Sequence, residues 1–193
     1  MLTAAMGLFG RQGYVGTSVS QIEAAAGLSP GSGALFRHFS SKRALLEAGI
    51  DRAVSTGAEL SSLLGDATAL AGLPLEERLL IVARAGLARL EQQQDLNRLV
   101  LRDLTRFPDL LERVRDREIG RTFEGFSLWL RHQPEASDGA DWDAVAMVLM
   151  GAVTHYWIMV DTFGSHPSGL DAERYLGAAA GLAAALVRSG ATP

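Results

Sequence analysis

Apolar residues recur at helical spacing along almost the whole chain, and this periodicity is the feature that most limits how the sequence can fold. The alternation of β-branched or aromatic residues with polar ones, which marks strands, is almost absent. Glycines stand where helix C-termini are expected, as at Gly13 and Gly27. The sequence therefore predicts an all-α protein.

Three short helices are expected near the N-terminus, and longer helices after them. A capping box made by Ser18 and Gln21 begins the second short helix. The short helices are expected over Leu2–Gln12, Val19–Ala26 and Ser32–Phe39. The longer helices are expected from Ser40 or Ser41 through Val54, from Pro74 to Gln93, and over Asp95–Arg106, Leu110–Leu130, Trp142–Thr162 and Leu170–Arg188.

Residue types that carry catalytic or metal chemistry are missing or scattered. The chain has no cysteine, which excludes disulfides and thiolate ligands, and its four histidines form no pair at metal-binding helical spacing. The segment Gly27-Leu28-Ser29-Pro30-Gly31 matches the pattern of a nucleophile elbow. No strand precedes it, however, and Pro30 has no N–H for an oxyanion hole. We expect no enzyme activity, no metal and no cofactor.

The longest mainly apolar stretch, Ala144–Val160, is close to the length that spans a membrane. Thr154 and His155 interrupt it, and Asp143 and Asp161 bracket it. The first residues lack the basic region of a signal peptide. We therefore expect a buried helix rather than a membrane span, no membrane partner, and a soluble, cytoplasmic protein.

The charge is distributed unevenly along the chain. The net charge is −4, yet residues 1–54 carry +2 and the rest carries −6. A mildly basic N-terminal part on an acidic body suits a protein that presents one end to a polyanion. Within that part, two short helices joined by a tight glycine turn and packed on a third are typical of a helix-turn-helix, here over about residues 18–39.

The first 50 residues resemble the DNA-binding domain of TetR-family transcriptional regulators, because many positions agree in order and spacing. The agreeing segments are Ala4-Ala5, Leu8-Phe9, Gly13-Tyr14, Thr17-Ser18-Val19, Ile22, Ala26-Gly27-Leu28-Ser29, Gly33-Ala34-Leu35-Phe36, His38-Phe39 and Ser41-Lys42-Arg43-Ala44-Leu45-Leu46. The resemblance implies a homodimer that binds double-stranded operator DNA, mostly as a repressor, and that a small-molecule effector releases. It also implies a DNA-binding domain over residues 1–46 and a helical regulatory and dimerisation domain over residues 47–193.

By position, the resemblance implies several DNA contacts. Thr17, beside Ser18, would meet a phosphate near the start of the second helix, and Ser29 would lie at the entry to the recognition helix. His38 and Lys42, the only lysine, would meet backbone phosphates. The residues expected in or beside the major groove are Ser32, Gly33, Ala34, Leu35 and Arg37. A solvated surface remains the alternative for Arg37 and Lys42, packing or capping for His38, and an N-cap for Ser32.

Two departures from the family pattern concern the same segment. The turn Ser29-Pro30-Gly31-Ser32-Gly33 carries two residues more than the family usually has, so the recognition helix begins later. Phe36 stands where the family usually has a tyrosine whose hydroxyl reaches a phosphate, and phenylalanine cannot make that hydrogen bond.

The body is expected to contain a dimer interface and a ligand pocket. A face of small residues near the C-terminus would let a partner helix lie close, and the alternative is an intramolecular core. That face consists of Leu176, Gly177, Ala180, Gly181, Ala184 and Val187. Bulky apolar residues with a few polar groups suggest a mainly hydrophobic ligand, and the alternative is ordinary core packing. They are Arg102, Phe107, Phe123, Phe126, Trp129, Met147, Met150, His155 and Trp157.

The sequence thus favours a DNA-binding transcriptional regulator, most simply a repressor released by a mainly hydrophobic ligand. Two other classes stay open. One is an all-α small-molecule-binding protein or enzyme without a DNA role. The other is a DNA-binding activator or architectural protein that has no ligand.

Overall fold

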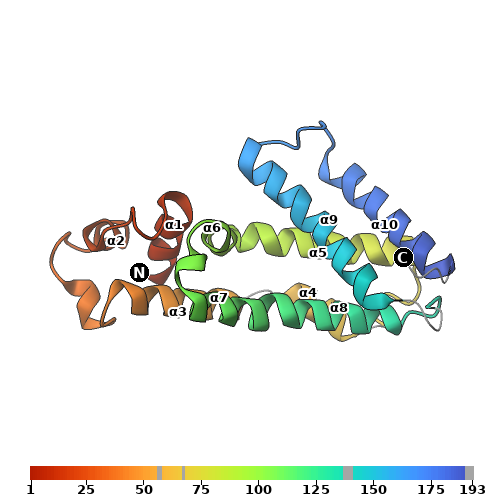
Figure 1. Ribbon diagram of the computed structural model, residues 1–193, viewed down its shortest axis with the longest axis horizontal. Helices are drawn as coiled ribbons and strands as arrows, with labels where there is room; N and C mark the ends of the chain where they lie inside the picture. Colours follow the sequence, from red (N-terminus) through yellow and green to blue (C-terminus); the bar gives the residue numbers. More distant parts are fainter. Residues whose placement is uncertain (56–57, 67, 137–140, 190–193) are drawn as a thin grey trace. The chain divides into compact units, whose positions relative to one another are not determined.

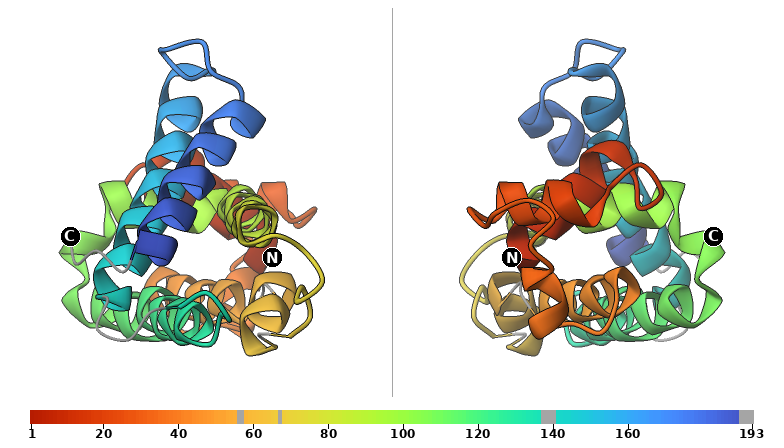
Figure 2. Two further views of the ribbon diagram at one scale, coloured as in Figure 1. Left: turned by 90° about the vertical axis from the view of Figure 1, so that its right-hand side faces the viewer. Right: turned by 90° about the vertical axis from the view of Figure 1, so that its left-hand side faces the viewer.

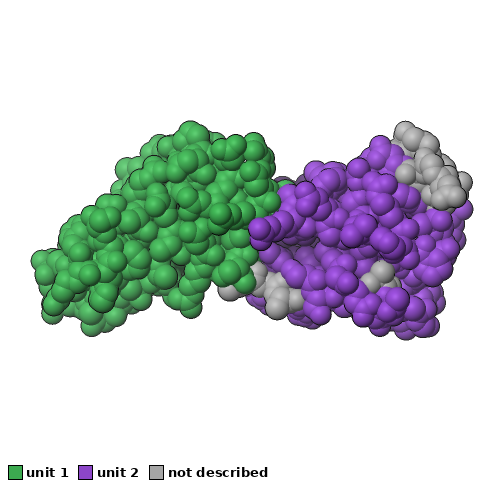
Figure 3. All heavy atoms as spheres, turned by 90° about the horizontal axis from the view of Figure 1, so that it is seen from below, with its two compact units in different colours: residues 1–56, 93–119 green, residues 57–92, 120–193 purple. Residues whose placement is uncertain are grey.

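The computed structural model describes residues 1–55, 58–66, 68–136 and 141–189, and over these residues its regular secondary structure is helical, without strands (Figure 1, Figure 2). The predicted all-α fold is confirmed. By packing, the chain divides into two compact units (Figure 3). Unit 1 comprises residues 1–56 and 93–119, and unit 2 comprises residues 57–92 and 120–193. The division into functional domains after residue 46 stays a prediction.

Unit 1 contains the N-terminal helices and a later segment that packs against them. Its helices are α1 (Leu2–Gln12), α2 (Val19–Ala25), the 3₁₀ helix η1 (Ala34–Arg37), α3 (Lys42–Val54), α6 (Gln94–Arg102), the 3₁₀ helix η2 (Leu104–Arg106) and α7 (Pro108–Val114). Apolar side chains from α1, α2, η1, α3 and α6 form one core, with Phe9, Ile22, Leu35, Leu46 and Leu99 completely buried. The later segment therefore supplies part of the core on which the N-terminal helices are held.

Serine side chains begin two of these helices. The hydroxyl of Ser18 accepts the N–H of Gln21 while the side chain of Gln21 accepts the N–H of Ser18, so the predicted capping box is confirmed. Ser41 accepts the N–H of Ala44 in the same way at the start of α3. These bonds satisfy backbone donors that the first helical turn leaves without a partner.

The third short helix is much shorter than predicted. A helix over Ser32–Phe39 was expected, and only the 3₁₀ helix η1 forms. Gly31 and Gly33 have φ angles of 76° and 70°. Because a right-handed helix cannot include residues in this left-handed region, the helical segment begins only after Gly33.

Two of the longer predicted helices are also interrupted. The helix expected over Asp95–Arg106 ends at Arg102 and continues as η2. The helix expected over Leu110–Leu130 is divided into α7, a π-helical segment (Arg115–Gly120) and α8 (Arg121–Arg131). Pro108 takes the first position of α7, where its missing N–H leaves no helical bond unmade.

Unit 2 contains α4 (Ala58–Gly65), α5 (Leu75–Gln92), α8, α9 (Trp142–Phe163) and α10 (Ala172–Ser189). α9 and α10 lie side by side, and both pack on α5 (Figure 2). Trp129, Trp142 and Leu149 lie in the principal core of this unit. Among the described helices, only α9 is long and apolar enough to cross a membrane, and a third of its most apolar window is buried.

α1 and α6 approach each other closely at Gly10. A Cβ atom added there would lie 2.5 Å from Oδ1 and 2.8 Å from Cα of Asp95, so the backbone of α6 would have to move. At Gly7, one turn earlier, the nearest atom is the Nη1 of Arg11 at 3.1 Å, which is the end of a flexible side chain.

We expect Gly10→Ala to lower the free energy of unfolding by about 1–3 kcal/mol, because overpacking outweighs the better helix propensity of alanine. Gly7→Ala is the matched control and should leave stability unchanged or raise it. Chemical denaturation monitored by circular dichroism measures both. Equal effects of the two substitutions would contradict the close approach at Gly10.

Candidate nucleic-acid interface

The segment between α2 and α3 exposes several of its side chains. Ser32, Phe36, Arg37 and His38 are exposed, and Phe36 keeps 55% of its surface accessible. Ala34 and Leu35 were expected in or beside the major groove, but both side chains are buried, Leu35 completely. η1 is a single 3₁₀ turn, and its side chains at Ala34 and Leu35 pack on the core. Only the other side of the turn is exposed. Burial therefore keeps the side chains of Ala34 and Leu35 from direct contact with bases.

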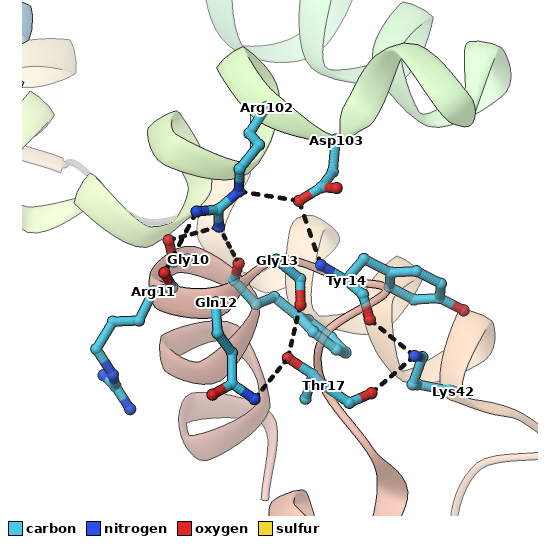
Figure 4. A network of polar contacts seen from close by, with 10 residues as sticks. Gly10, Arg11, Gln12, Gly13, Tyr14, Thr17, Lys42, Arg102 and Asp103 are labelled. Atoms are coloured by element: carbon cyan, nitrogen blue, oxygen red, sulfur yellow. Dashed lines mark hydrogen bonds and ion pairs between the residues drawn. The ribbon is translucent and has the colours of Figure 1, made fainter.

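The loop between α1 and α2 is fixed by hydrogen bonds from Thr17 and Lys42 (Figure 4). Thr17 is buried, and its hydroxyl donates to the carbonyl of Gly13 at 2.7 Å. The Nζ of Lys42 donates to the carbonyls of Tyr14 and Thr17, both at 2.8 Å, and lies 4.1 Å from the centre of the Tyr14 ring. Two of the three N–H groups of Lys42 are thus used inside the protein, and one remains for a phosphate.

Burial among these groups lowers the pKa of Lys42. Both carbonyls and the aromatic ring favour the charged ammonium, so the cation stays in place despite this cost. Ser18 caps α2 and is exposed, and Ser29 is exposed in the turn after α2. The predicted DNA contacts are not tested by these positions. They stay predictions for Thr17, Ser18, Ser29, His38 and Lys42.

The end of α6 holds the end of α1 (Figure 4). Arg102 donates from Nη2 to the carbonyls of Phe9 and Gly10, at 2.7 and 2.8 Å, and from Nη1 to the carbonyl of Arg11 at 3.3 Å. These carbonyls lie at the C-terminal end of α1, where a cation also interacts favourably with the helix dipole. Arg102 was predicted to contact a ligand, and the structure instead places its guanidinium on the backbone of α1.

Asp103, the next residue, was not identified from the sequence. Its Oδ2 accepts the N–H of Tyr14 at 3.2 Å and the Nε of Arg102 at 3.2 Å. The side chain is almost fully buried. Arg102 and Asp103 together therefore fix both the last turn of α1 and the start of the following loop.

Ion pairs tie α3 to the segment that begins with α7. Arg43 pairs with Glu47 on its own helix and with Asp109 on α7, and it lies over the ring of Phe107. Asp51 pairs with Arg113 at 3.2 Å and with Arg117 at 3.7 Å. All of these side chains are partly exposed, so each pair alone contributes little to stability. As a set they align α3 along the following segment.

The residues predicted to line a ligand pocket do not gather in one place. Phe107 lies in unit 1 and its ring is 4.9 Å from that of Tyr14. In unit 2, the rings of Phe126 and Trp129 stack at 6.1 Å, and Phe123 and Met150 pack against the same core. Trp157 belongs to a separate cluster, Met147 is half exposed, and His155 is exposed beside Tyr175. Phe123, Phe126, Trp129 and Met150 remain the predicted ligand contacts that share a core.

The predicted dimer face on α10 is mostly covered within one chain. Leu176, Ala180, Ala184 and Val187 are at most 1% exposed, and only Gly177 and Gly181 are partly accessible. The small residues let α10 lie close to α5 and α9 instead, which is the intramolecular alternative.

The opposite side of α9 and α10 is apolar and accessible. A groove of about 330 Å³ runs between the two helices, and Val148 and Leu182 beside it are 67% and 71% exposed. The lining residues are Val145, Val148, Leu149, Ala152, Leu170, Tyr175, Ala178, Ala179, Leu182, Ala183 and Leu186. This surface could have been predicted from the sequence, because apolar residues occur on both faces of α10. A helix that is apolar all round needs partners on two sides.

Among the described residues, no three His, Asp or Glu side chains lie together as a metal site needs. In unit 1, the short segment from Ser32 to His38 is partly exposed, and hydrogen bonds and ion pairs hold the helices around it. Such a unit can place a few side chains against a regular surface such as the edge of a duplex.

Comparisons with known proteins agree with this geometry. Residues 1–48 match the model of the family described as bacterial regulatory proteins, tetR family. No curated protein matches the chain. A crystal structure of a protein assigned to the TetR family of transcriptional regulators, from Mesorhizobium loti, shares the fold. It is 24% identical, with a TM-score of 0.71 over 96% of this chain and 93% of that one.

Two further structures have the same fold. The TetR family transcriptional regulator PfmR from Thermus thermophilus is 22% identical, with a TM-score of 0.68 over 95% of this chain and 96% of its own. GusR from Salmonella enterica is 20% identical, also with a TM-score of 0.68, over 97% of this chain and 93% of its own.

The ion pair of Asp109 makes stability depend on pH. A hydrogen bond from Arg43 holds the pKa of the Asp109 carboxyl below its ordinary value. Because the unfolded chain then binds the proton more tightly, this contribution is present above the ordinary carboxyl pKa and is lost as the pH falls through the lowered value. Asp109→Asn should therefore destabilise the protein at about pH 6, and this effect should shrink steadily as the pH falls below the ordinary carboxyl pKa of about 3.9. Urea unfolding across this range measures it, and a difference that stays constant would contradict the ion pair.

Proposed function

We propose that the protein is a dimeric repressor released from its operator by a small, mainly hydrophobic ligand, because residues 1–48 match the model of bacterial regulatory proteins of the tetR family. The N-terminal domain and the fold are those of a DNA-binding transcriptional regulator. The finer parts of the proposal are the sign of regulation, the dimer and the ligand.

The observation that carries the proposal is the exposed segment between Gly31 and His38. With Ala34 and Leu35 buried, base contacts fall to Ser32, Phe36 and Arg37. An arginine can bond O6 and N7 of guanine in the major groove, and a phenylalanine can contact the methyl group of thymine. Phe36 thus replaces the phosphate contact of the usual tyrosine with an apolar contact. His38 and the third N–H of Lys42 supply the phosphate contacts that fix the register on the duplex.

A dimer is needed because two such segments must reach successive major grooves, about 34–36 Å apart. The apolar outer side of α9 and α10 supports a two-fold contact in which these helices pair with the same helices of a second copy. That contact would cover Val148 and Leu182, two large exposed apolar side chains. We therefore propose the outer side of α9 and α10 as the dimer interface, in place of the buried face of α10.

Release requires that ligand binding change the position of the DNA-binding helices. α3 begins at Lys42, which braces the loop after α1, and its ion pairs connect it to α7. A mainly hydrophobic ligand that enters near Phe126 and Trp129 would shift α3 and turn the two recognition segments out of register. A coupling free energy of about 1–3 kcal/mol between ligand and operator is sufficient.

Footprinting of the purified protein on the intergenic DNA upstream of its own gene tests the DNA-binding proposal. We expect a protected inverted repeat whose half-sites are centred about one helical turn, or a multiple of it, apart. Arg37→Ala should lose this protection, because it removes the proposed guanine contact. Arg52→Ala, which removes an exposed arginine at the end of α3, should retain it.

The absence of any protected repeat on upstream DNA, together with equal binding to unrelated duplexes, would overturn the proposal. Such a result would favour an all-α small-molecule-binding protein without a DNA role.

The dimer interface is tested by placing a charge on the outer side of α10. We expect Leu182→Glu to shift the protein from dimer to monomer in sedimentation velocity and to weaken operator binding, because a buried carboxylate without a partner is costly. Leu128→Glu, at a leucine of α8 that is 56% exposed, is the matched control and should remain dimeric. A Leu182→Glu protein that stays dimeric would place the interface elsewhere.

A further inference from the structure

Glu23 is the only acidic residue among the first 46, and its side chain is completely buried. It lies in the last turn of α2, at the negative end of the helix dipole. Burial of a carboxylate at such a position is costly unless hydrogen bonds satisfy it. No sequence pattern assigned a role to this residue. Its buried charge at the C-terminal end of a helix needs a structural explanation.

Both carboxylate oxygens of Glu23 accept backbone N–H groups from the turn that follows α2. Oε2 accepts the N–H of Gly31 at 2.7 Å, and Oε1 accepts the N–H of Leu35 at 3.2 Å. Its backbone carbonyl accepts the N–H of Leu28 at 2.8 Å. One residue therefore bonds the start, the middle and the end of the connection from α2 to η1.

The other hydrogen bonds that the described residues make in this turn run between near neighbours. The N–H of Ser32 bonds the carbonyl of Ser29, that of Ala34 bonds the hydroxyl of Ser32, and that of Phe36 bonds the carbonyl of Gly33. Such local bonds shape the turn but do not anchor it to α2. A turn with two glycines at positive φ also loses much backbone entropy when it is ordered, so it needs an anchor of this kind.

We propose that Glu23 is a positioning residue for DNA recognition. Its buried carboxylate holds the amides of Gly31 and Leu35, and so fixes the orientation in which Phe36 and Arg37 meet the base edges. The carboxylate compensates for the two additional residues of this turn, which leave η1 farther along the chain from α2. This inference rests on the proposed function, since it assigns a role within the same DNA-binding segment.

The test is Glu23→Gln, which keeps the size of the side chain but leaves one acceptor oxygen instead of two. We expect operator affinity to fall by about tenfold, because one amide loses a charge-assisted bond and the segment loses its fixed orientation. Binding to unrelated duplex should change little. Glu112→Gln, at an exposed glutamate of α7, removes the same charge from unit 1 and should retain operator affinity.

Amide NMR separates positioning from a general loss of structure. In Glu23→Gln the amide protons of Gly31 and Leu35 should shift upfield and exchange faster with solvent, whereas that of Leu28 should stay unchanged. Leu28 is an internal control because it bonds the backbone carbonyl of the same residue. If Glu23→Gln does not fold, amide hydrogen exchange is measured in the wild-type protein instead. Slow exchange of the Gly31 and Leu35 amides supports the inference, and fast exchange overturns it.

Two outcomes distinguish this inference from the function on which it rests. Wild-type protein without an operator footprint would overturn the proposed function. Wild-type protein with a footprint, and a folded Glu23→Gln protein that binds the operator equally well, would overturn only the role of Glu23. Parallel losses in operator binding, unrelated duplex binding and melting temperature, with the amides of Gly31 and Leu35 unshifted, would also overturn that role.

Discussion

The C-terminal end of α1 leaves backbone carbonyls without helical partners, and the way they are satisfied determines the arrangement of unit 1. Arg102 donates to the carbonyls of Gly10 and Arg11, and also to that of Phe9, which already accepts the N–H of Gly13. Asp103 accepts the N–H of Tyr14 in the loop that follows. Lys42 then bonds two carbonyls of that loop. α1, α3 and α6 are thus joined at one loop by polar contacts to backbone, which cannot be replaced by apolar packing alone. These contacts hold the helices against which the exposed segment after α2 packs.

Two of the accessible surfaces formed by the described residues differ in chemistry. The segment with Ser32, Phe36 and Arg37 is short and carries hydrogen-bonding and apolar groups suited to base edges. The outer side of α9 and α10 is broad and apolar, and suits a second copy of the same helices. Pairing through the outer side of α9 and α10 would present two copies of the segment after α2 to a symmetric duplex.

Local signals in the sequence predicted the all-α fold, α1 and the capping box of α2, because periodicity and side-chain caps act over a few residues. The length of the third helix was missed, since the positive φ angles of Gly31 and Gly33 are chosen by the tertiary structure. The inner face of α10 could not be told from an interface, because apolar residues cover both sides of that helix. The roles of Arg102, Asp103 and Glu23 depend on backbone groups up to 93 residues away, which no local pattern records.

The enclosure of Lys42 gives the protein an unusual chemical property. It is the only lysine, so the chain has a single side-chain amine, and that amine is held between two carbonyls and an aromatic ring. Acylation of this one nitrogen would remove a cation from the loop that unit 1 is built around. Reagents selective for side-chain amines therefore react at one position, beside the loop between α1 and α2.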